Sequence, residues 1–236
     1  MELSDRLKAI ADMVTHGNSL VDVGCDHGYL PIYLVKKGII KSAVASDVNK
    51  GPLEAARRNI KLYGIDENVI RTRISDGLKN ILPGEGESLV IAGMGGALTV
   101  KILEESFDTF YSFEEVILQP QSEIEKVRKF VSENGWKISE EDFLKEDGKY
   151  YSVMRLVKTS EKVEYSEEEL LYGPCLIRIK HTVLFEFLLE KYEKYSIICE
   201  GLMNKNSSDA RIGQRISELK KEIDSIKRVL DGNYEF

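Results

Sequence analysis

Short apolar runs alternate with helical patterns over the first 160 residues of the chain. Between most of these runs the apolar residues recur every three or four positions, as in "GPLEAARRNIKLYG" (51–64) and "QSEIEKVRKFVSENG" (121–135), which is typical of amphipathic helices. This order predicts an α/β fold with a mainly parallel sheet and helices on both faces. The last two runs have no helix between them, so we expect them to form an antiparallel hairpin at one edge. The strands are predicted at 20–23, 42–46, 69–74, 88–91, 115–118, 137–143 and 151–157.

The composition changes near residue 160. The stretch "TSEKVEYSEEEL" (159–170) is polar and acidic, which is typical of a linker or a domain boundary. We therefore expect one domain over residues 1–160 and a second over residues 161–236. In the second domain the polar run "NKNSSD" (204–209) predicts a turn, with Ser208 or Asp209 as a helix N-cap. Apolar residues on both sides of this turn predict two antiparallel helices packed as a coiled-coil hairpin. They are Leu184, Leu188, Tyr195, Ile198 and Leu202 before the turn, and Ile212, Ile216, Leu219, Ile223, Ile226 and Leu230 after it.

Two readings of this hairpin stay open. Its apolar seam packs the two helices within a monomer, which we favour, or it forms a dimer interface. Residues 205–230 carry a net charge of +3, so the arm either contacts phosphate or presents a solvated helix face.

Net charge argues mildly against a nucleic-acid partner, because the chain carries −7 in total. Local charge decides what a phosphate meets, however, and residues 1–80 carry a net +2. The basic side chains of this segment are therefore candidates for RNA binding, each with solvated surface charge as its alternative. They are Arg6, Lys8, Arg57, Arg58, Arg71 and Arg73.

The cysteine and histidine pattern disfavours a metal site. Cys25, Cys175 and Cys199 are far apart, and the three histidines form no HxH or HxxxH pair. Dispersed thiols fit a reduced, cytoplasmic setting. No segment reads as a signal peptide, and no apolar run approaches the roughly 20 residues that cross a bilayer, so we expect no membrane association.

Candidate chemistry begins in "LVDVGCDHGYLPIYL" (20–34). Asp22, Gly24 and Gly28 fall on the turn between the first strand and its helix, where ligands bind in open α/β sheets. The two glycines let the backbone bend and approach a ligand closely. Asp26 stands where a dinucleotide-binding GxGxxG loop has its middle glycine, and a carboxylate there would repel a pyrophosphate. A cationic ligand such as S-adenosylmethionine fits better.

Two further acids support this interpretation. Asp47 ends the second predicted strand, where a carboxylate can accept both ribose hydroxyls, and Asp76 ends the third, where it can accept the adenine amino group. Each alone is equally typical of a strand end or a helix cap, but acids at three consecutive strand ends indicate a class I methyltransferase. The fourth strand leads into Gly93–Gly96, "GMGG", which has no side-chain acceptor to hold an amine. The expected nucleophile is therefore a ring nitrogen.

Six segments, in their order, resemble the bacterial tRNA (adenine-22-N1)-methyltransferase family: "LSDRL", "VDVGCDHGYLP", "ASDVNKGPLEAARRNI", "SDGL", "IAGMGG" and "LQPQSE". The resemblance covers essentially the whole chain and implies a Rossmann-like class I methyltransferase sheet followed by a helical coiled-coil domain. It also implies transfer of the S-adenosylmethionine methyl group to N1 of an adenine in the D-arm region of tRNA. Carried over residue by residue, cofactor binding falls on Asp22, Gly24, Asp26, His27, Gly28, Asp47, Val48, Asp76, Gly77, Gly93 and Met94.

The same mechanism suggests catalytic candidates. A carboxylate near the methylated base would stabilise its positive charge or take up a proton, and Asp26 is the first candidate, with Asp5 second. Tyr29 is a candidate for stacking on the base. The alternatives are that Asp26 caps the following helix and that Tyr29 only packs. We expect His27 to orient the cofactor or its loop.

Gln119 and Gln121 follow the fifth strand, and either read a base edge or cap the next helix. The same cofactor site also suits a class I methyltransferase that acts on another RNA, a protein or a small molecule. A further alternative is a noncatalytic adaptor that binds S-adenosylmethionine and recruits a partner through the hairpin.

Overall fold

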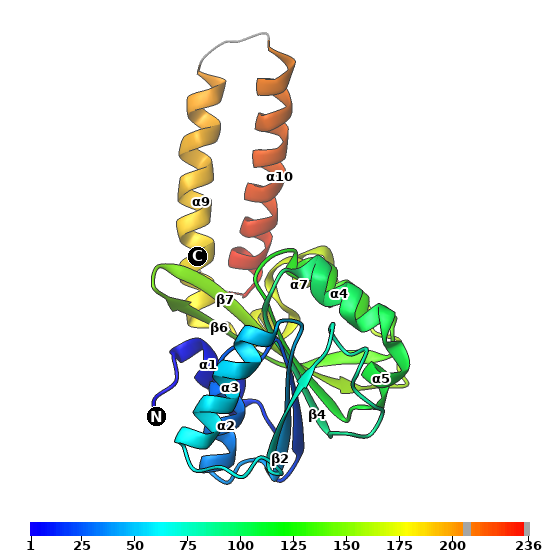
Figure 1. The fold of residues 1–236 in the computed structure, drawn as a ribbon. Coiled ribbons are helices and arrows are strands. Elements are labelled where there is room, and N and C mark those ends of the chain that lie inside the picture. The colour runs from blue at the N-terminus through cyan, green and yellow to red at the C-terminus, as the bar shows by residue number, and fades with distance from the viewer. Residues whose placement is uncertain (205–208, 234–236) are drawn as a thin grey trace. The chain divides into compact units, whose positions relative to one another are not determined.

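The computed structural model describes residues 1–204 and 209–233. The chain forms two compact units, Met1–Glu164 and Tyr165–Phe236, and this division falls four residues after the predicted boundary. The first unit is built on one seven-stranded sheet in the order β3-β2-β1-β4-β5-β7-β6 (Figure 1). The strands are β1 (Ser19–Val23), β2 (Ser42–Asp47), β3 (Ile70–Ile74), β4 (Ser88–Met94), β5 (Glu115–Pro120), β6 (Trp136–Glu146) and β7 (Lys149–Lys158).

The sheet is parallel from β3 to β5 and antiparallel at one edge. β1 pairs in parallel with both β2 and β4, and β4 with β5. β7 runs antiparallel to both β5 and β6. The predicted mixed sheet with an edge hairpin is therefore confirmed. The central strands are almost wholly buried, as expected for parallel strands covered on both faces.

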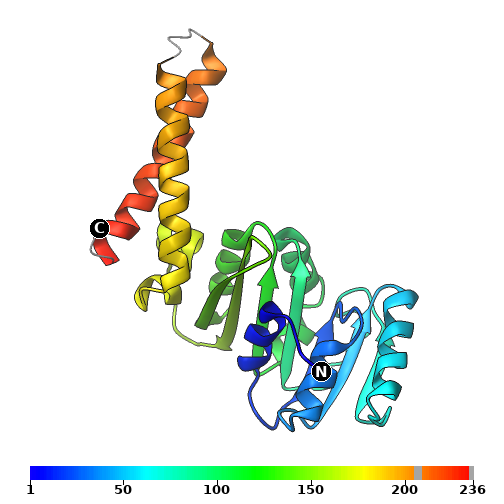
Figure 2. The same ribbon diagram turned by 90° about the vertical axis from the view of Figure 1, so that its left-hand side faces the viewer.

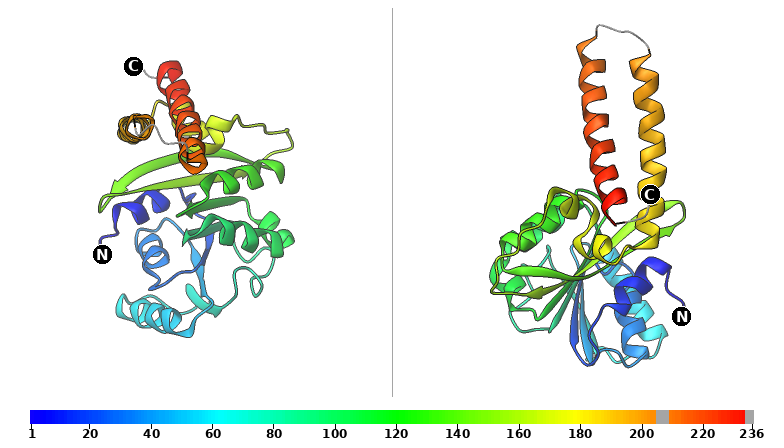
Figure 3. Two further views of the ribbon diagram at one scale, coloured as in Figure 1. Left: turned by 90° about the horizontal axis from the view of Figure 1, so that it is seen from above. Right: turned by 180° about the vertical axis from the view of Figure 1, so that it is seen from behind.

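Helices cover both faces of the sheet, as Figure 3 shows. One layer is α1 (Asp5–Asp12), α2 (Tyr29–Lys36) and α3 (Lys50–Leu62), and the other is α4 (Gly96–Glu105), α5 (Phe107–Ser112) and α6 (Ile124–Glu133). Under the second layer the Phe110 and Trp136 rings stack with centroids 4.9 Å apart. A buried ion pair, Arg128 Nε to Glu141 Oε1 at 2.9 Å, ties α6 to β6.

Two carboxylates hold the first helix on the sheet. Glu146, at the end of β6, accepts hydrogen bonds from the backbone N–H groups of Asp5 (2.7 Å) and Arg6 (3.4 Å) at the start of α1. Glu115, at the start of β5, is buried and accepts from the backbone N–H and hydroxyl of Thr15, beyond the helix. The position of α1 is therefore set by residues more than 90 positions away in the sequence.

The second unit is helical and contains α7 (Glu167–Tyr172), α8 (Pro174–Arg178), α9 (Thr182–Met203) and α10 (Ala210–Asn233). Figures 1 and 2 show α9 and α10 side by side, running in opposite directions. Of the predicted seam, Leu219, Ile226 and Leu230 are fully buried. On α9 the prediction is wrong at one place, because Ile198 is 38 % exposed while the neighbouring Cys199 is buried.

One of the two predicted caps of α10 is observed. The Asp209 carboxylate accepts a hydrogen bond from the Arg211 backbone N–H at 2.9 Å, whereas Ser208 lies outside the described residues. The helices in the described part of the chain include none long and apolar enough to span a membrane.

Candidate active site

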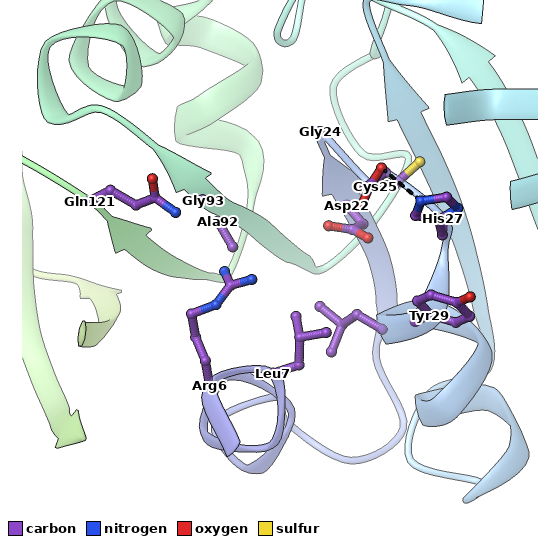
Figure 4. Close-up of a pocket in the computed structure, with 12 residues that line it drawn as sticks. Arg6, Leu7, Asp22, Gly24, Cys25, His27, Tyr29, Ala92, Gly93 and Gln121 are labelled. Carbon is purple, nitrogen blue, oxygen red and sulfur yellow. Dashed lines mark ion pairs between the residues drawn. The ribbon is translucent and has the colours of Figure 1, made fainter. Parts of the chain in front are cut away.

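A cavity of about 320 Å³ lies at the carboxyl ends of β1 and β4 (Figure 4). The strand order reverses between these two strands, because β1 continues to β2 and β3 while β4 continues to β5. Ligands of open α/β sheets bind at such a point. Six of the residues predicted for cofactor binding or catalysis line the cavity, namely Asp22, Gly24, Asp26, His27, Tyr29 and Gly93.

The turn between β1 and α2 has left-handed backbone at Gly24 (φ +76°), Asp26 (φ +50°) and Gly28 (φ +71°). A Cβ atom at Gly28 would lie 3.1 Å from that of Ala56, so this glycine also allows α2 to approach α3. Gly28 is the N-cap of α2, and this helix has no side-chain cap. Asp26 therefore does not cap it. Its carboxylate is 73 % exposed and lies 3.5 Å from His27 Nε2.

Asp22 is the charged centre of the cavity. Only 5 % of the residue is exposed, and burial, together with the nearby charge of Asp47, raises the pKa of its carboxyl to about 7. Within the described part of the chain, no group donates a hydrogen bond to this carboxylate. Because a buried carboxylate is costly without a partner, the site fits a ligand that brings a cation or a hydrogen-bond donor to it.

At the end of β4 the cavity is lined by Ala92 and Gly93. Gly93 has φ +78°, and its N–H donates to Gln119 Oε1 at 3.2 Å. The methyl group of Met94 packs against Gly24, where a Cβ atom would lie only 2.4 Å from it. Of the four residues Gly93–Gly96, the cavity lining includes Gly93, which contributes backbone alone.

The two glutamines have different environments. Gln119 is 1 % exposed, and its Oε1 accepts from Arg6 Nη1 at 2.8 Å as well as from Gly93. It is thus occupied within the protein and is not placed to read a base. Gln121 is exposed at the cavity rim. The N-cap of α6 is Glu123, so neither glutamine caps that helix.

Comparison with known proteins identifies the family. The model of the family described as tRNA (adenine(22)-N(1))-methyltransferase matches residues 20–228. The chain belongs to this family. The tRNA (adenine(22)-N(1))-methyltransferase of Bacillus subtilis is 31% identical over 235 residues, covering 98% of each chain. A Streptococcus pneumoniae protein solved with S-adenosyl-L-methionine has a TM-score of 0.85 at 32% identity, covering 97% of this chain and 100% of its own. TrmK of M. capricolum, solved with S-adenosylhomocysteine, has a TM-score of 0.77 at 26% identity, covering 96% of this chain and 100% of its own.

One catalytic candidate of this methyltransferase does not reach the cavity. Asp5 is exposed in the first turn of α1 and pairs with Lys8 at 3.0 Å. Successive helix residues point about 100° apart, and with α1 held by Glu146 it is Arg6, not Asp5, that lines the cavity. Asp5 therefore lies outside the lining of this cavity, and its role as a catalytic carboxylate stays a prediction. Arg6, predicted as an RNA contact, lines the same cavity as several of the cofactor candidates.

Three more cofactor candidates follow the neighbouring strands and lie outside the lining of this cavity. Asp47 ends β2, and its Oδ1 accepts from the Asn49 backbone N–H at 2.8 Å. Val48 is 58 % exposed. Gly77 (φ +59°) meets α4 so closely that a Cβ atom would lie 2.9 Å from Ile102.

Asp76 is the cofactor candidate whose surroundings differ most from those expected. It lies two residues beyond the end of β3, and its carboxylate is 2.6 Å from Lys79 Nζ. Lys79 also contacts Glu105 at 3.0 Å. The adenine-binding role of Asp76 stays a prediction, and it requires this carboxylate to exchange or share its lysine partner.

Several RNA-binding candidates already have partners within the protein. Arg73 binds both oxygens of Glu85, Lys8 binds Asp5, and Arg57 Nε donates to Thr72 at 2.7 Å. Within the described ranges no side-chain hydrogen bond or ion pair engages Arg58 or Arg71. These two remain available for phosphate. The described residues include no cluster of three His, Cys, Asp or Glu side chains suited to a metal ion.

Proposed function

We propose that this chain transfers the methyl group of S-adenosylmethionine to N1 of the adenine at position 22, in the D-arm region of tRNA. The observation that carries the proposal is the buried Asp22 carboxylate, which borders the cavity and has no protein donor within the described residues. S-adenosylmethionine has both an ammonium group and a sulfonium centre. Family membership supports the nucleic-acid substrate and the modified atom.

The cofactor would be held by residues at the ends of four strands, β1 to β4. Asp22 would accept a hydrogen bond from the ammonium group, and the oxygen of Asp47 that does not bind Asn49 is a candidate acceptor for the ribose hydroxyls. Gly24, Gly28 and Gly93, all at positive φ, let the backbone approach closely. Asp76 is the candidate acceptor for the adenine amino group.

The acceptor base would enter at the exposed rim. N1 lies on the Watson–Crick edge, so the adenine must leave its stack first. Tyr29 is 40 % exposed and stacks on His27, with ring centroids 5.6 Å apart, which makes an aromatic surface for the base. When bound, S-adenosylmethionine supplies an electrophilic methyl group, and the N1 lone pair forms the new bond while the electrons of the broken bond stay on sulfur. Asp26, exposed beside His27, would stabilise the positive charge that appears on the base.

The remaining contacts with tRNA are assigned to Arg58, Arg71 and the second unit. Residues 205–230 carry a net charge of +3, and phosphate contacts dominate affinity for nucleic acids. The burial of Leu219, Ile226 and Leu230 uses much of the apolar seam inside one hairpin, which supports a monomer. We propose that the protein acts in the cytoplasm, because its proposed substrate is tRNA.

Nucleoside mass spectrometry tests the proposal. Unmodified tRNA is incubated with the protein and methyl-labelled S-adenosylmethionine, then digested. We expect labelled 1-methyladenosine, lost when the same tRNA carries a different base at position 22. Labelled 6-methyladenosine would refute the assigned atom, and label in added protein but not in tRNA would refute the substrate.

A further inference from the structure

Two backbone hydrogen bonds fix the loop after β5 to the end of β4. The Gln121 N–H donates to the Met94 carbonyl oxygen at 2.8 Å, and the Gly96 N–H donates to the Ser122 carbonyl oxygen at 2.9 Å. The second bond requires a close approach, because a Cβ atom at Gly96 would lie 2.4 Å from the Ser122 oxygen. The backbone of Gln121 is therefore held in one place beside the β4 turn.

The side chain of Gln121 borders the cavity without a partner. Within the part of the chain that the structure describes, no hydrogen bond engages its carboxamide, and the residue is exposed at the cavity rim. Its Nε2 lies 3.9 Å from the point that a Cβ atom of Gly93 would occupy. Figure 4 shows this carboxamide on the Gly93 side of the cavity, away from Asp22 and His27. The loop after β5 thus supplies a carboxamide beside the glycines of β4.

The position of Gln121 in the sheet favours a contact with the base over one with the cofactor. Most cofactor candidates follow β1, β2 and β3, whereas Gln121 follows β5, on the other side of β4. The methyl group must lie between the cofactor and its acceptor. A base that enters at the rim therefore has the β4–β5 side of the cavity next to it.

A carboxamide matches one edge of adenine. The Hoogsteen edge of adenine presents the N6 amino group as a donor and N7 as an acceptor, and glutamine binds this pair with two hydrogen bonds. Guanine presents two acceptors there, O6 and N7, so the carboxamide oxygen would face another acceptor. Methylation at N1 needs the Watson–Crick edge to face the methyl group. Contacts with the Hoogsteen edge leave that edge free.

We propose that Gln121 recognises the target adenine through its Hoogsteen edge, accepting from the N6 amino group and donating to N7. This assignment rests on the proposed function, which supplies adenine N1 as the methylated atom. Gln121 is then a residue that determines base specificity, and it complements the aromatic surface of His27 and Tyr29.

Methylation of two synthetic tRNAs tests the assignment. One carries adenine at position 22, and the other carries 7-deazaadenine, in which a C–H group replaces N7 while N1 keeps its lone pair. Gln121→Ala should lower kcat/KM for the adenine tRNA by about 5- to 100-fold, the range for a bidentate contact. The preference for adenine over 7-deazaadenine should be about 2- to 10-fold larger in wild type than in this variant, the effect of one hydrogen bond. The intrinsic reactivity of N1 cancels in this comparison, because it is the same for both proteins.

Two more variants and a binding measurement complete the test. Gln121→Glu keeps an acceptor for the amino group but places an oxygen against N7, so its preference should shift toward 7-deazaadenine. Ser122→Ala changes the next residue of the loop, which does not line the cavity, and should keep the wild-type preference. Calorimetry should show unchanged affinity of Gln121→Ala for S-adenosylmethionine, which also shows that this variant is folded.

Two results would overturn the assignment. The first is the same preference between the two tRNAs in wild type, Gln121→Ala and Gln121→Glu, since no contact with N7 would then exist. The second is a loss of cofactor affinity in Gln121→Ala as large as its loss in kcat/KM, which would make Gln121 a cofactor contact. Failure of the proposed function looks different, because the wild-type protein would then methylate N1 at position 22 in neither tRNA.

Discussion

The ionisation of Asp22 should make the cofactor-free protein less stable at neutral pH. Burial and the charge of Asp47 raise the pKa of this carboxyl from 3.8 to about 7. The unfolded chain releases the proton near pH 4 and the folded chain near pH 7, so the folded state holds more protons in between. Stability therefore falls as the pH rises through this window, by roughly 4 kcal/mol if the whole difference is realised. The Asp22→Asn variant keeps the shape of the side chain and removes this dependence.

Urea unfolding of both proteins at pH 5 and pH 8 measures the effect. Between these two values the variant should gain about 2 to 3 kcal/mol of unfolding free energy relative to wild type. The same variant should lose cofactor affinity at pH 8, because an amide cannot pair with an ammonium group as a carboxylate does. A difference between the two proteins that is the same at both pH values would refute the reasoning, since it would show that Asp22 ionises with an ordinary pKa.

Three further changes probe separate parts of the site. Gly96→Ala should destabilise the protein by roughly 1–3 kcal/mol in thermal unfolding, because its Cβ atom would lie 2.4 Å from the Ser122 carbonyl oxygen. The matched control is Gly213→Ala in α10, where the added Cβ atom meets nothing within 4 Å. This control should stabilise the protein by roughly 0.5–1 kcal/mol in the same assay. Asp47→Ala should weaken S-adenosylmethionine binding by about tenfold or more, and unchanged affinity by calorimetry would remove it from the site. Tyr29→Ala should lower kcat/KM for tRNA while cofactor affinity and the activity of Tyr29→Phe are retained; equal losses in both variants would argue against stacking.

The fold was predictable because its signals are local. Each parallel strand is an apolar run, and each crossover helix has its own periodicity, so the order of elements determines the fold class. The lengths of β4 and β5 were less accessible. Both continue past the predicted ends, to Met94 and Pro120, because they pair with each other through an irregularity between Ala92 and Met94. The sequence of either strand alone does not indicate cross-strand pairing of this kind.

The place of the edge hairpin was also beyond the sequence pattern. The chain makes β6 before β7, yet β7 lies next to β5 and β6 forms the edge. A hairpin can dock through either of its strands, and the local pattern of both is compatible with either choice. The buried Arg128 and Glu141 pair, with Arg128 also donating to Ser152 at 3.2 Å, connects α6 to both strands of the observed arrangement.

The site residues also fall into two groups: those that the local sequence identifies and those whose position depends on distant parts of the chain. Asp22 and Gly24 were identified from the turn that contains them, because a strand, an acid and a bend occur within a few residues. Asp76 differs from Asp22, because its carboxylate already pairs with Lys79, three residues later. This ion pair competes with a ligand for the same carboxylate. A strand-end acid is therefore a good indicator of a site only where no nearby cation can occupy it.

Arg6 shows why the other half of the cavity could not be found this way. Its hydrogen-bond acceptor is Gln119, its ring neighbour is Tyr151, and its helix is anchored by Glu146 and, through Thr15, by Glu115. All of these belong to strands that come more than 100 residues later, so which residue of α1 faces the cavity is decided only once β5, β6 and β7 have assembled. The β1 turn can form early from local sequence, but the cation that complements Asp22 depends on the far edge of the sheet. We therefore expect substitutions that loosen the β6–β7 edge to displace Arg6 from the cavity, even where the turn that contains Asp22 is intact.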